Sequence, residues 1–252
     1  ECKGCGDCAE VCPVRGIPSE FDAHLRTVSA AHISFPSSVP PVYVIDEEKC
    51  LHLNHGICGL CERSCSANAV DFSQKPETIS LNVGAIVIAT GYEQKYPEFY
   101  TRLAGESPNV LSSMQFERLL SANGPTGGQL IRLDDKKHPH EVAFLQCVGS
   151  RDFHHPECMK YCSSICCMSS AKQAIITKEH APDTDCLIYN TEIRAKGKNF
   201  YEFIVKSKEE YGVQYVNGRV SHVKQNPENG KLILHYEDIE KGMVETREVD
   251  MA

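Results

Sequence analysis

The sequence has no long apolar run, no excess of basic residues, and no serine or cysteine nucleophile in a recognised catalytic setting. Its longest apolar run, residues 83–89 with Gly84 inside it, is far too short to span a bilayer. The formal net charge of -8, from 26 basic and 34 acidic side chains, argues against a nucleic-acid binder. We therefore expect a soluble acidic protein that meets other proteins or small molecules, with no nucleic acid as partner and no membrane span.

A true G-x-G-x-x-G phosphate-binding fingerprint is also missing. Residues 4–9 formally satisfy G-x-G-x-x-A, but no strand precedes them and two of the spacers are cysteines. No signal peptide is visible, although a missing start would hide one, and the chain begins without methionine. It stops at 249–252, where another buried strand would be expected. We expect a fragment truncated at both ends.

Cysteine is present in excess, with 14 in 252 residues. An extracellular disulfide framework would use many cysteines, but such scaffolds are usually short and secreted. Here the cysteines fall into groups at metal-ligand spacing and include the adjacent pair Cys166 and Cys167. The pattern favours metal or cluster ligation in a reducing cytoplasm.

The first cysteine group opens the chain, as ECKGCGDCAEVCP. Three cysteines recur with two residues between them, and a fourth follows after three more and precedes a proline. This spacing is typical of three ligands to one [4Fe–4S] cube, with the fourth given to a neighbouring cluster. The second group ends in CGLCERSC, but seven residues separate its first cysteine, Cys50, from Cys58, and Ser66 replaces the usual proline.

In two-cluster ferredoxins the fourth cysteine of each motif ligates the other cluster. The expected ligand sets are Cys2, Cys5, Cys8 and Cys65 for one cube, and Cys50, Cys58, Cys61 and Cys12 for the other. The insertion at 51–57 leaves open whether Cys50 is the fourth ligand, and His52 or His55 is the alternative ligand. A pair of structural zinc sites is the alternative, although zinc sites usually space their paired cysteines more widely. Residues 1–75 are predicted to be a two-cluster ferredoxin module with helical turns after each cysteine group.

The rest of the chain predicts an α/β fold. The apolar run at 83–91 indicates a strand buried on both faces, and 117–121 are expected in a short helix before a turn-rich loop at 123–128. Further strands are predicted at 142–146, 186–189 and 213–216, helices at 162–180 and from an Asn199 cap to Tyr211, and a closing meander at 220–224, 232–236 and 243–249. This order resembles one dinucleotide-binding half of a two-domain flavoprotein.

The third cysteine group lies within this pattern. Cys147 follows a predicted strand, where a dinucleotide-binding fold carries its glycine-rich phosphate turn, and Cys162 and Cys166 would share a helix face. We expect this domain to have exchanged a nucleotide for a metal cofactor; the alternative is a helix that buries thiols as small hydrophobes. Cys158 is either a further ligand or a spare. Cys186, alone in an apolar strand, is expected in the core.

Over nearly its whole length the chain resembles the A-type subunit of heterodisulfide reductase, an iron–sulfur flavoprotein. The resemblance is carried by residues 2–13, VGAIVIATGY (83–92), FERLLSANGPTGG (116–128), FLQCVGSRD (144–152) and YCSSICCM (161–168), of which the last two together are highly specific. It implies a thioredoxin-reductase-like flavoprotein with an inserted ferredoxin module, a return segment of the FAD-binding domain at 76–140, and a Rossmann-like domain at 141–252.

The resemblance also implies site residues. Ala89, Thr90 and Gly91 would pack close to the flavin, while the glycine-rich FAD turn would lie upstream of this chain. A noncanonical [4Fe–4S] cluster would be held by the cysteines that match the family's ligands, namely Cys147, Cys162, Cys166 and Cys167. Cys158 would then be the extra cysteine.

The function implied is that of an oxidoreductase subunit that moves electrons between FAD and about three [4Fe–4S] clusters in a larger complex. In some members of the family the flavin bifurcates an electron pair. Disulfide cleavage takes place in a partner subunit, so no catalytic acid, base or nucleophile is assigned to this chain. The implied partners are the other subunits, a hydrogenase or formate dehydrogenase module, ferredoxin, and a second copy of the chain. The alternatives are the flavin/iron–sulfur subunit of a quinone-interacting membrane-associated oxidoreductase and, in another class, a zinc-stabilised non-redox interaction module.

Overall fold

The computed structural model describes residues 1–91, 94, 103 and 107–252. The chain divides into two compact units, Glu1–Glu93 and Gln94–Ala252, each of which is described by itself. The finer division expected at 1–75, 76–140 and 141–252 stays a prediction. Among the described residues, no helix is both long and apolar enough to cross a membrane.

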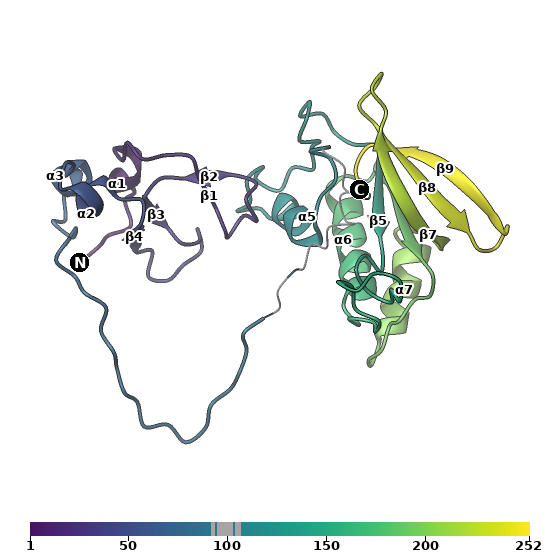
Figure 1. The fold of residues 1–252 in the computed structure, drawn as a ribbon, viewed down its shortest axis with the longest axis horizontal. Coiled ribbons are helices and arrows are strands. Elements are labelled where there is room, and N and C mark those ends of the chain that lie inside the picture. The colour runs from purple at the N-terminus through teal and green to yellow at the C-terminus, as the bar shows by residue number, and fades with distance from the viewer. Residues whose placement is uncertain (92–93, 95–102, 104–106) are drawn as a thin grey trace. The chain divides into compact units, whose positions relative to one another are not determined.

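Short elements around the cysteines make up the first unit (Figure 1). Helical turns accompany the cysteine groups as predicted: α1 (Asp7–Glu10), α2 (Leu51–His55) and α3 (Leu60–Ser64). Two antiparallel pairs join β1 (Ile17–Pro18) to β2 (Thr27–Val28) and β3 (Ala31–Ile33) to β4 (Tyr43–Ile45). The small apolar core of this unit contains Cys12, Ala30 and Ala31. Because so few apolar side chains are buried, we infer that this fold depends on the groups its thiols hold.

The strand predicted at 83–91 is wrong. The segment has no regular secondary structure, and Ile86, Val87 and Ile88 are 81%, 89% and 83% exposed. A strand exists only where a neighbouring strand satisfies its backbone groups. No strand in the described part of the chain pairs with this segment. The apolar composition of this segment therefore predicted burial, but it could not predict whether a neighbouring strand is present to pair with it.

A five-stranded sheet of order β5-β6-β7-β8-β9 forms the centre of the second unit. The first three strands are parallel: β5 (Glu141–Leu145), β6 (Asp185–Asn190) and β7 (Gln214–Gln225). β8 (Leu232–Asp238) and β9 (Met243–Val249) complete an antiparallel meander, after which Met251 makes a parallel bridge with Val142 of β5. The strands predicted at 213–216 and 220–224 are one strand, β7, with an irregularity between Val220 and His222.

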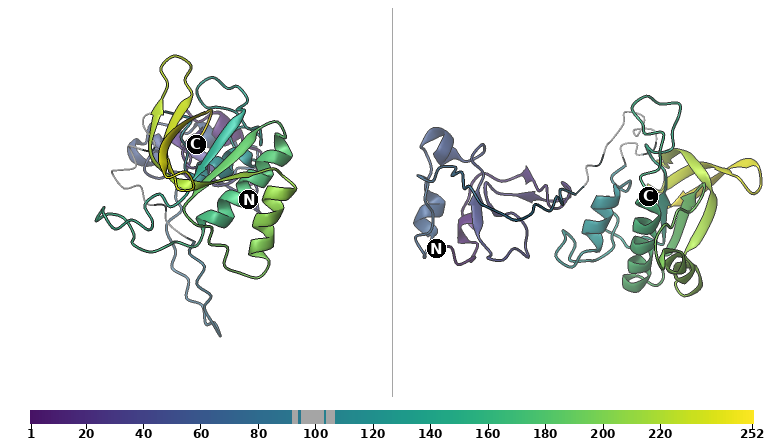
Figure 2. Two further views of the ribbon diagram at one scale, coloured as in Figure 1. Left: turned by 90° about the vertical axis from the view of Figure 1, so that its right-hand side faces the viewer. Right: turned by 90° about the horizontal axis from the view of Figure 1, so that it is seen from below.

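Two helices connect the parallel strands and lie side by side on one face of the sheet (Figures 1 and 2). α6 (Cys166–His180) joins β5 to β6, and α7 (Phe200–Glu209) joins β6 to β7. α6 begins later than the predicted residue 162, because Ser164 has a left-handed φ of 59° that a right-handed helix excludes. Asn199 precedes α7 as predicted, but it too is left-handed and its side chain does not cap the helix.

A third helix, α5 (Ser113–Leu120), packs against α6. It contains residues 117–120 of the segment predicted inside a short helix, and it begins where Ser112 and Gln115 form a capping box that satisfies the first backbone N–H groups. The core of the second unit lies on the sheet, where Leu187, Leu232 and Val249 are fully buried. Cys186 is 1% exposed in β6 and belongs to the interior, as predicted.

Candidate functional site

The first predicted thiol set lines one cavity of about 420 Å³ in the first unit: Cys2, Cys5, Cys8 and Cys65. Two of its sulfurs accept backbone N–H groups, Cys2 from Gly4 at 3.4 Å and Cys65 from Ala69 at 3.3 Å. The hydrogen bond from Ala69 is the largest of several that lower the pKa of Cys65. Thiolates are the ligands of iron–sulfur clusters, so a lowered pKa suits this role.

Tyr43 of β4 lies against the same loop and was not anticipated from the sequence. A Cβ added to Gly6, which has a φ of +91°, would lie 2.9 Å from the Tyr43 hydroxyl oxygen. Burial raises the pKa of Tyr43, and the nearby thiols of Cys8 and Cys5 add to the effect. No sequence pattern marks this residue, since the pairing of β3 with β4 is what positions it.

The second predicted set lines another cavity in the same unit: Cys12, Cys50, Cys58 and Cys61. Cys12 belongs to the first sequence motif, so this cavity brings thiols of both motifs together, and the crossed ligation expected of a two-cluster ferredoxin stays a prediction. Burial raises the pKa of Cys61, with smaller contributions from Cys50 and Cys12. Cys61 also interacts electrostatically with Cys8 of the first set, so the two thiol sets lie next to each other.

Both Cys50 and His52 line this second cavity, so the choice of ligand between them stays a prediction. The Nδ1 of His52 is hydrogen-bonded to the Cys58 carbonyl, and the His52 ring stacks on Phe72 with centroids 3.8 Å apart. His55 is exposed and does not line the cavity. Most of the insertion at 51–57 forms α2, and Cys50, which directly precedes this helix, lines the cavity with the other three thiols.

The third predicted set gathers at the carboxyl end of β5. Cys147 follows that strand as predicted, and Cys166 and Cys167 open α6. The predicted helix face shared by Cys162 and Cys166 is wrong, because Cys162 lies in the loop before the helix. Gln146 Nε2 donates a hydrogen bond of 2.6 Å to Ser170 Oγ, which ties the end of β5 to α6.

The thiols of this third set interact with one another. A hydrogen bond with the Cys166 thiol raises the pKa of Cys147, and burial adds to the effect. The pKa of Cys167 is lowered to about 7, chiefly by Cys166 and also by the Arg194 backbone N–H, which lies 3.5 Å from Cys167 Sγ. The Cys162 sulfur accepts the Ser164 N–H at 3.3 Å.

Two arginines face the third set and were not assigned a role from the sequence. The Arg151 guanidinium interacts electrostatically with the Cys147 thiol, and the Arg194 guanidinium with the Cys162 thiol. Their positive charge favours thiolates and the negatively charged cluster that thiolates hold. Arg151 belongs to the motif FLQCVGSRD and could have been noticed; Arg194 is brought in by the segment after β6.

The residues predicted to contact a flavin lie elsewhere. Ala89, Thr90 and Gly91 are exposed in the extended segment and do not line either cavity described above. Their contact with FAD stays a prediction. Each thiol set, by contrast, offers the four sulfurs that a [4Fe–4S] cluster takes.

Comparisons with known proteins agree with this chemistry. Residues 1–69 match the family model described as 4Fe-4S dicluster domain. Over 99% of its length the chain is 41% identical to the A-type iron–sulfur subunit of CoB--CoM heterodisulfide reductase from Methanocaldococcus jannaschii. Over nearly its whole length the chain is thus similar to the A-type subunits of heterodisulfide reductases. A second relative, the A-type subunit of H(2):CoB-CoM heterodisulfide,ferredoxin reductase from Methanothermobacter thermautotrophicus, is 39% identical over 99% of the chain.

A third member of the heterodisulfide reductase family comes from Methanosarcina acetivorans. It is the A-type subunit of the Ferredoxin/F(420)H(2)-dependent CoB-CoM heterodisulfide reductase, and it is 38% identical over the whole chain. The chain spans 37% of the length of the first two relatives and 31% of the third. The matches confirm the family resemblance and an iron–sulfur protein with [4Fe–4S] clusters in its first unit.

Proposed function

We propose that the chain is the electron-transfer part of a heterodisulfide-reductase-type oxidoreductase and passes electrons between FAD and three [4Fe–4S] clusters. The observation that carries this proposal is the gathering of the thiols into three separate sets, each able to complete the ligation of one cluster. The proposed ligands are Cys2, Cys5, Cys8 and Cys65; Cys12, Cys50, Cys58 and Cys61; and Cys147, Cys162, Cys166 and Cys167.

The clusters, when bound, supply reversible one-electron chemistry. The part of the protein is to hold them, fix their separation, and set their potentials. In the first unit, Cys8 and Cys61 interact across the two thiol sets, which suits electron exchange between neighbouring clusters. At the third set, Arg194 and Arg151 would favour the more negative, reduced state and so raise its potential.

A Rossmann-type role for the second unit is supported by the order of its elements. β5, α6, β6, α7 and β7 alternate and the strands are parallel. In such sheets ligands bind beyond the carboxyl ends of the strands, which is where Cys147 meets the start of α6. We propose that the third cluster occupies the position that a dinucleotide phosphate takes in related folds. We further propose that residues 89–91, within the return segment 76–140, contact FAD.

The names of the relatives support the choice of partners. They mention the CoB-CoM heterodisulfide, ferredoxin, H(2) and F(420)H(2). We propose a cytoplasmic complex in which other subunits cleave the disulfide and ferredoxin exchanges electrons with this chain. Bifurcation at the flavin is part of the proposal, since one relative is named for both the heterodisulfide and ferredoxin.

Metal analysis of the anaerobically purified protein tests this function. We expect about twelve irons per chain, from three clusters of about four irons each, and paramagnetic signals that develop on stepwise reduction. A colourless protein with stoichiometric zinc and no reducible centre would instead support the zinc-stabilised, non-redox module. Identification of the neighbouring subunits in the purified complex tests the proposed partners separately.

A further inference from the structure

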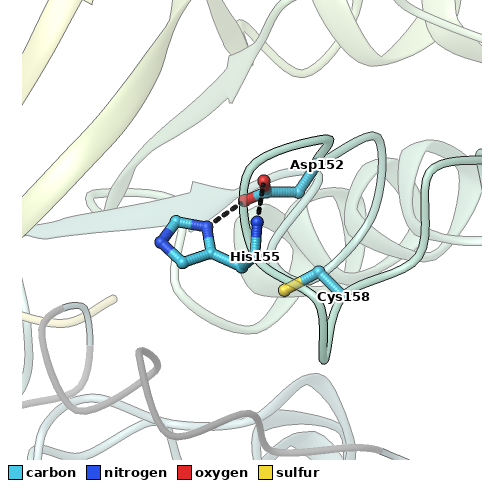
Figure 3. Close-up of side chains that lie close together, drawn as sticks. All are labelled: Asp152, His155 and Cys158. Carbon is cyan, nitrogen blue, oxygen red and sulfur yellow. Dashed lines mark hydrogen bonds and ion pairs between the residues drawn. The ribbon is translucent and has the colours of Figure 1, made fainter.

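Three donor side chains that the proposed clusters do not use lie together in the loop between Cys147 and Cys162 (Figure 3). They are Asp152, His155 and Cys158. One carboxylate oxygen, one imidazole nitrogen and the thiol sulfur of this group all lie within 4.8 Å of one another. A carboxylate, an imidazole and a thiol at this separation form a mixed donor set suited to a single metal ion.

Backbone hydrogen bonds hold this loop closed at its base. Ser150 and Met159 form a parallel bridge, and the Asp152 N–H donates to the Met159 carbonyl at 3.2 Å. A tighter turn follows, in which the Cys158 N–H donates to the His155 carbonyl at 3.1 Å. The donors are therefore brought together by main-chain geometry, which reduces the cost of ordering them around an ion.

Asp152 is held ionised and oriented. Its side chain is 7% exposed, and its Oδ1 accepts the backbone N–H groups of His154 and His155 at 2.9 and 3.2 Å. Burial opposes ionisation, but these hydrogen bonds and His155 lower the pKa of Asp152 to about 2. Its Oδ2 lies 2.9 Å from His155 Nδ1, so an ion bound by both side chains would replace the proton that these two atoms share.

Cys158 is separate from the third thiol set. It is 8% exposed, and the charged groups that act on it are Asp152, Glu157 and Arg219 rather than the four thiols of that set. Burial raises the pKa of Cys158, and the carboxylates of Asp152 and Glu157 add to the effect. Arg219, 3.6 Å from Asp152 Oδ2, compensates only one of these negative charges. A bound dication would supply the positive charge that this buried group lacks.

We propose that Asp152, His155 and Cys158 bind one divalent metal ion of borderline softness, with Zn²⁺ as the expected ion. One thiolate and one carboxylate neutralise the dication, the imidazole is the third ligand, and water completes a tetrahedral site. The ion would fasten the loop that separates two proposed cluster ligands, Cys147 and Cys162. The site needs neither a flavin nor electron transfer, so it goes beyond the proposed function.

The test uses the anaerobically purified chain with its clusters in place, freed of loosely bound metal and then equilibrated with micromolar ZnCl₂. We expect one zinc per chain, and zinc-edge X-ray absorption with one sulfur at about 2.3 Å and nitrogen or oxygen ligands at about 2.0–2.2 Å. Cys158→Ser and His155→Gln should each weaken zinc binding about tenfold or more. The matched controls His154→Gln and Cys186→Ser should bind zinc like the parent, and all four variants should keep the parental iron content.

Any of four results would overturn the proposal, the first three of which concern zinc. The parent protein could retain no stoichiometric zinc, the zinc could carry several sulfur ligands, or both ligand variants could bind zinc like the controls. Loss of iron from Cys158→Ser would also overturn it, because Cys158 would then be a cluster ligand. If Cys158→Ser does not fold, His155→Gln decides alone. Iron content reports on the proposed function and zinc content on this site, so the two can fail separately.

Discussion

Replacing Cys162 by alanine is the sharpest test of the third thiol set. Cys162 is only partly buried and lies in a loop, so its truncation leaves no sealed cavity in the core. Its sulfur accepts the Ser164 N–H and faces the Arg194 guanidinium, an environment suited to a thiolate ligand. The matched control is Cys186→Ala, which removes a thiol that is 1% exposed within β6.

The two changes should differ in iron content and not only in stability. Cys162→Ala should lower the iron content from about twelve to about eight per chain, because one cluster of about four irons is lost. The proposed ligands of the other two clusters all lie between residues 2 and 65, in the other unit, and are untouched. Cys186→Ala should keep about twelve irons, while its small cavity costs about 1 kcal/mol of stability.

Iron and sulfide per chain, together with electron paramagnetic resonance during stepwise reduction, measure the outcome. The spectrum of Cys162→Ala should lose one component and keep the signals of the ferredoxin pair. If its iron content and spectrum equal those of the parent, our assignment of ligands is refuted. If Cys186→Ala loses as much iron as Cys162→Ala, the loss reports damage to the fold rather than to ligation.

Three further changes test other parts of the molecule. Gly4→Ala sets a Cβ 2.7 Å from the Pro41 carbonyl oxygen at a φ of +72°, whereas Gly16→Ala meets nothing within 4 Å at +83°. Both should cost about 1–2 kcal/mol in backbone strain, but only Gly4→Ala should lose the iron of the first cluster. Tyr43→Phe should keep all iron and lower the reduction potential of that cluster, measured by redox titration. The expected decrease is about 40 mV for each 1 kcal/mol by which the hydroxyl stabilises the reduced state of the cluster. An unchanged potential would show that the hydroxyl does not act on the cluster. The hydrogen bond from Arg132 lowers the pKa of Asp134, so its stabilisation is complete above about pH 4 and is lost as the pH falls. Asp134→Asn should therefore unfold at lower denaturant concentration than the parent at pH 7, with a difference that shrinks below about pH 4; a constant difference would contradict this origin.

Spacing along the chain was enough to predict the grouping of the first-unit cysteines. Ligands two residues apart, such as Cys5 and Cys8, are brought together by one turn of backbone, so the local sequence decides their geometry. The strands of the sheet were equally predictable, because β6 and β8 are apolar runs bounded by turns. The place of Cys147 just after β5 followed from the same pattern.

Other features depended on partners that the sequence does not specify. The apolar segment at 83–91 has a composition typical of a strand, but no strand of the described chain pairs with it and it stays exposed. Tyr43 reaches the first thiol set through strand pairing, and Arg194 reaches the third set from the segment after β6. Such contacts join residues far apart in the chain, and no local periodicity records them.

The cysteine spacing by itself therefore determined that this protein gathers thiols into sets of four, because neighbouring ligands obey local backbone geometry. The tertiary structure brings Cys65 to the first motif and Cys12 to the second, which is the exchange that the two-cluster pattern predicts. It also decided that Cys158 lies with Asp152 and His155 and apart from the third set, because a loop closed by backbone hydrogen bonds, rather than a helix, carries it.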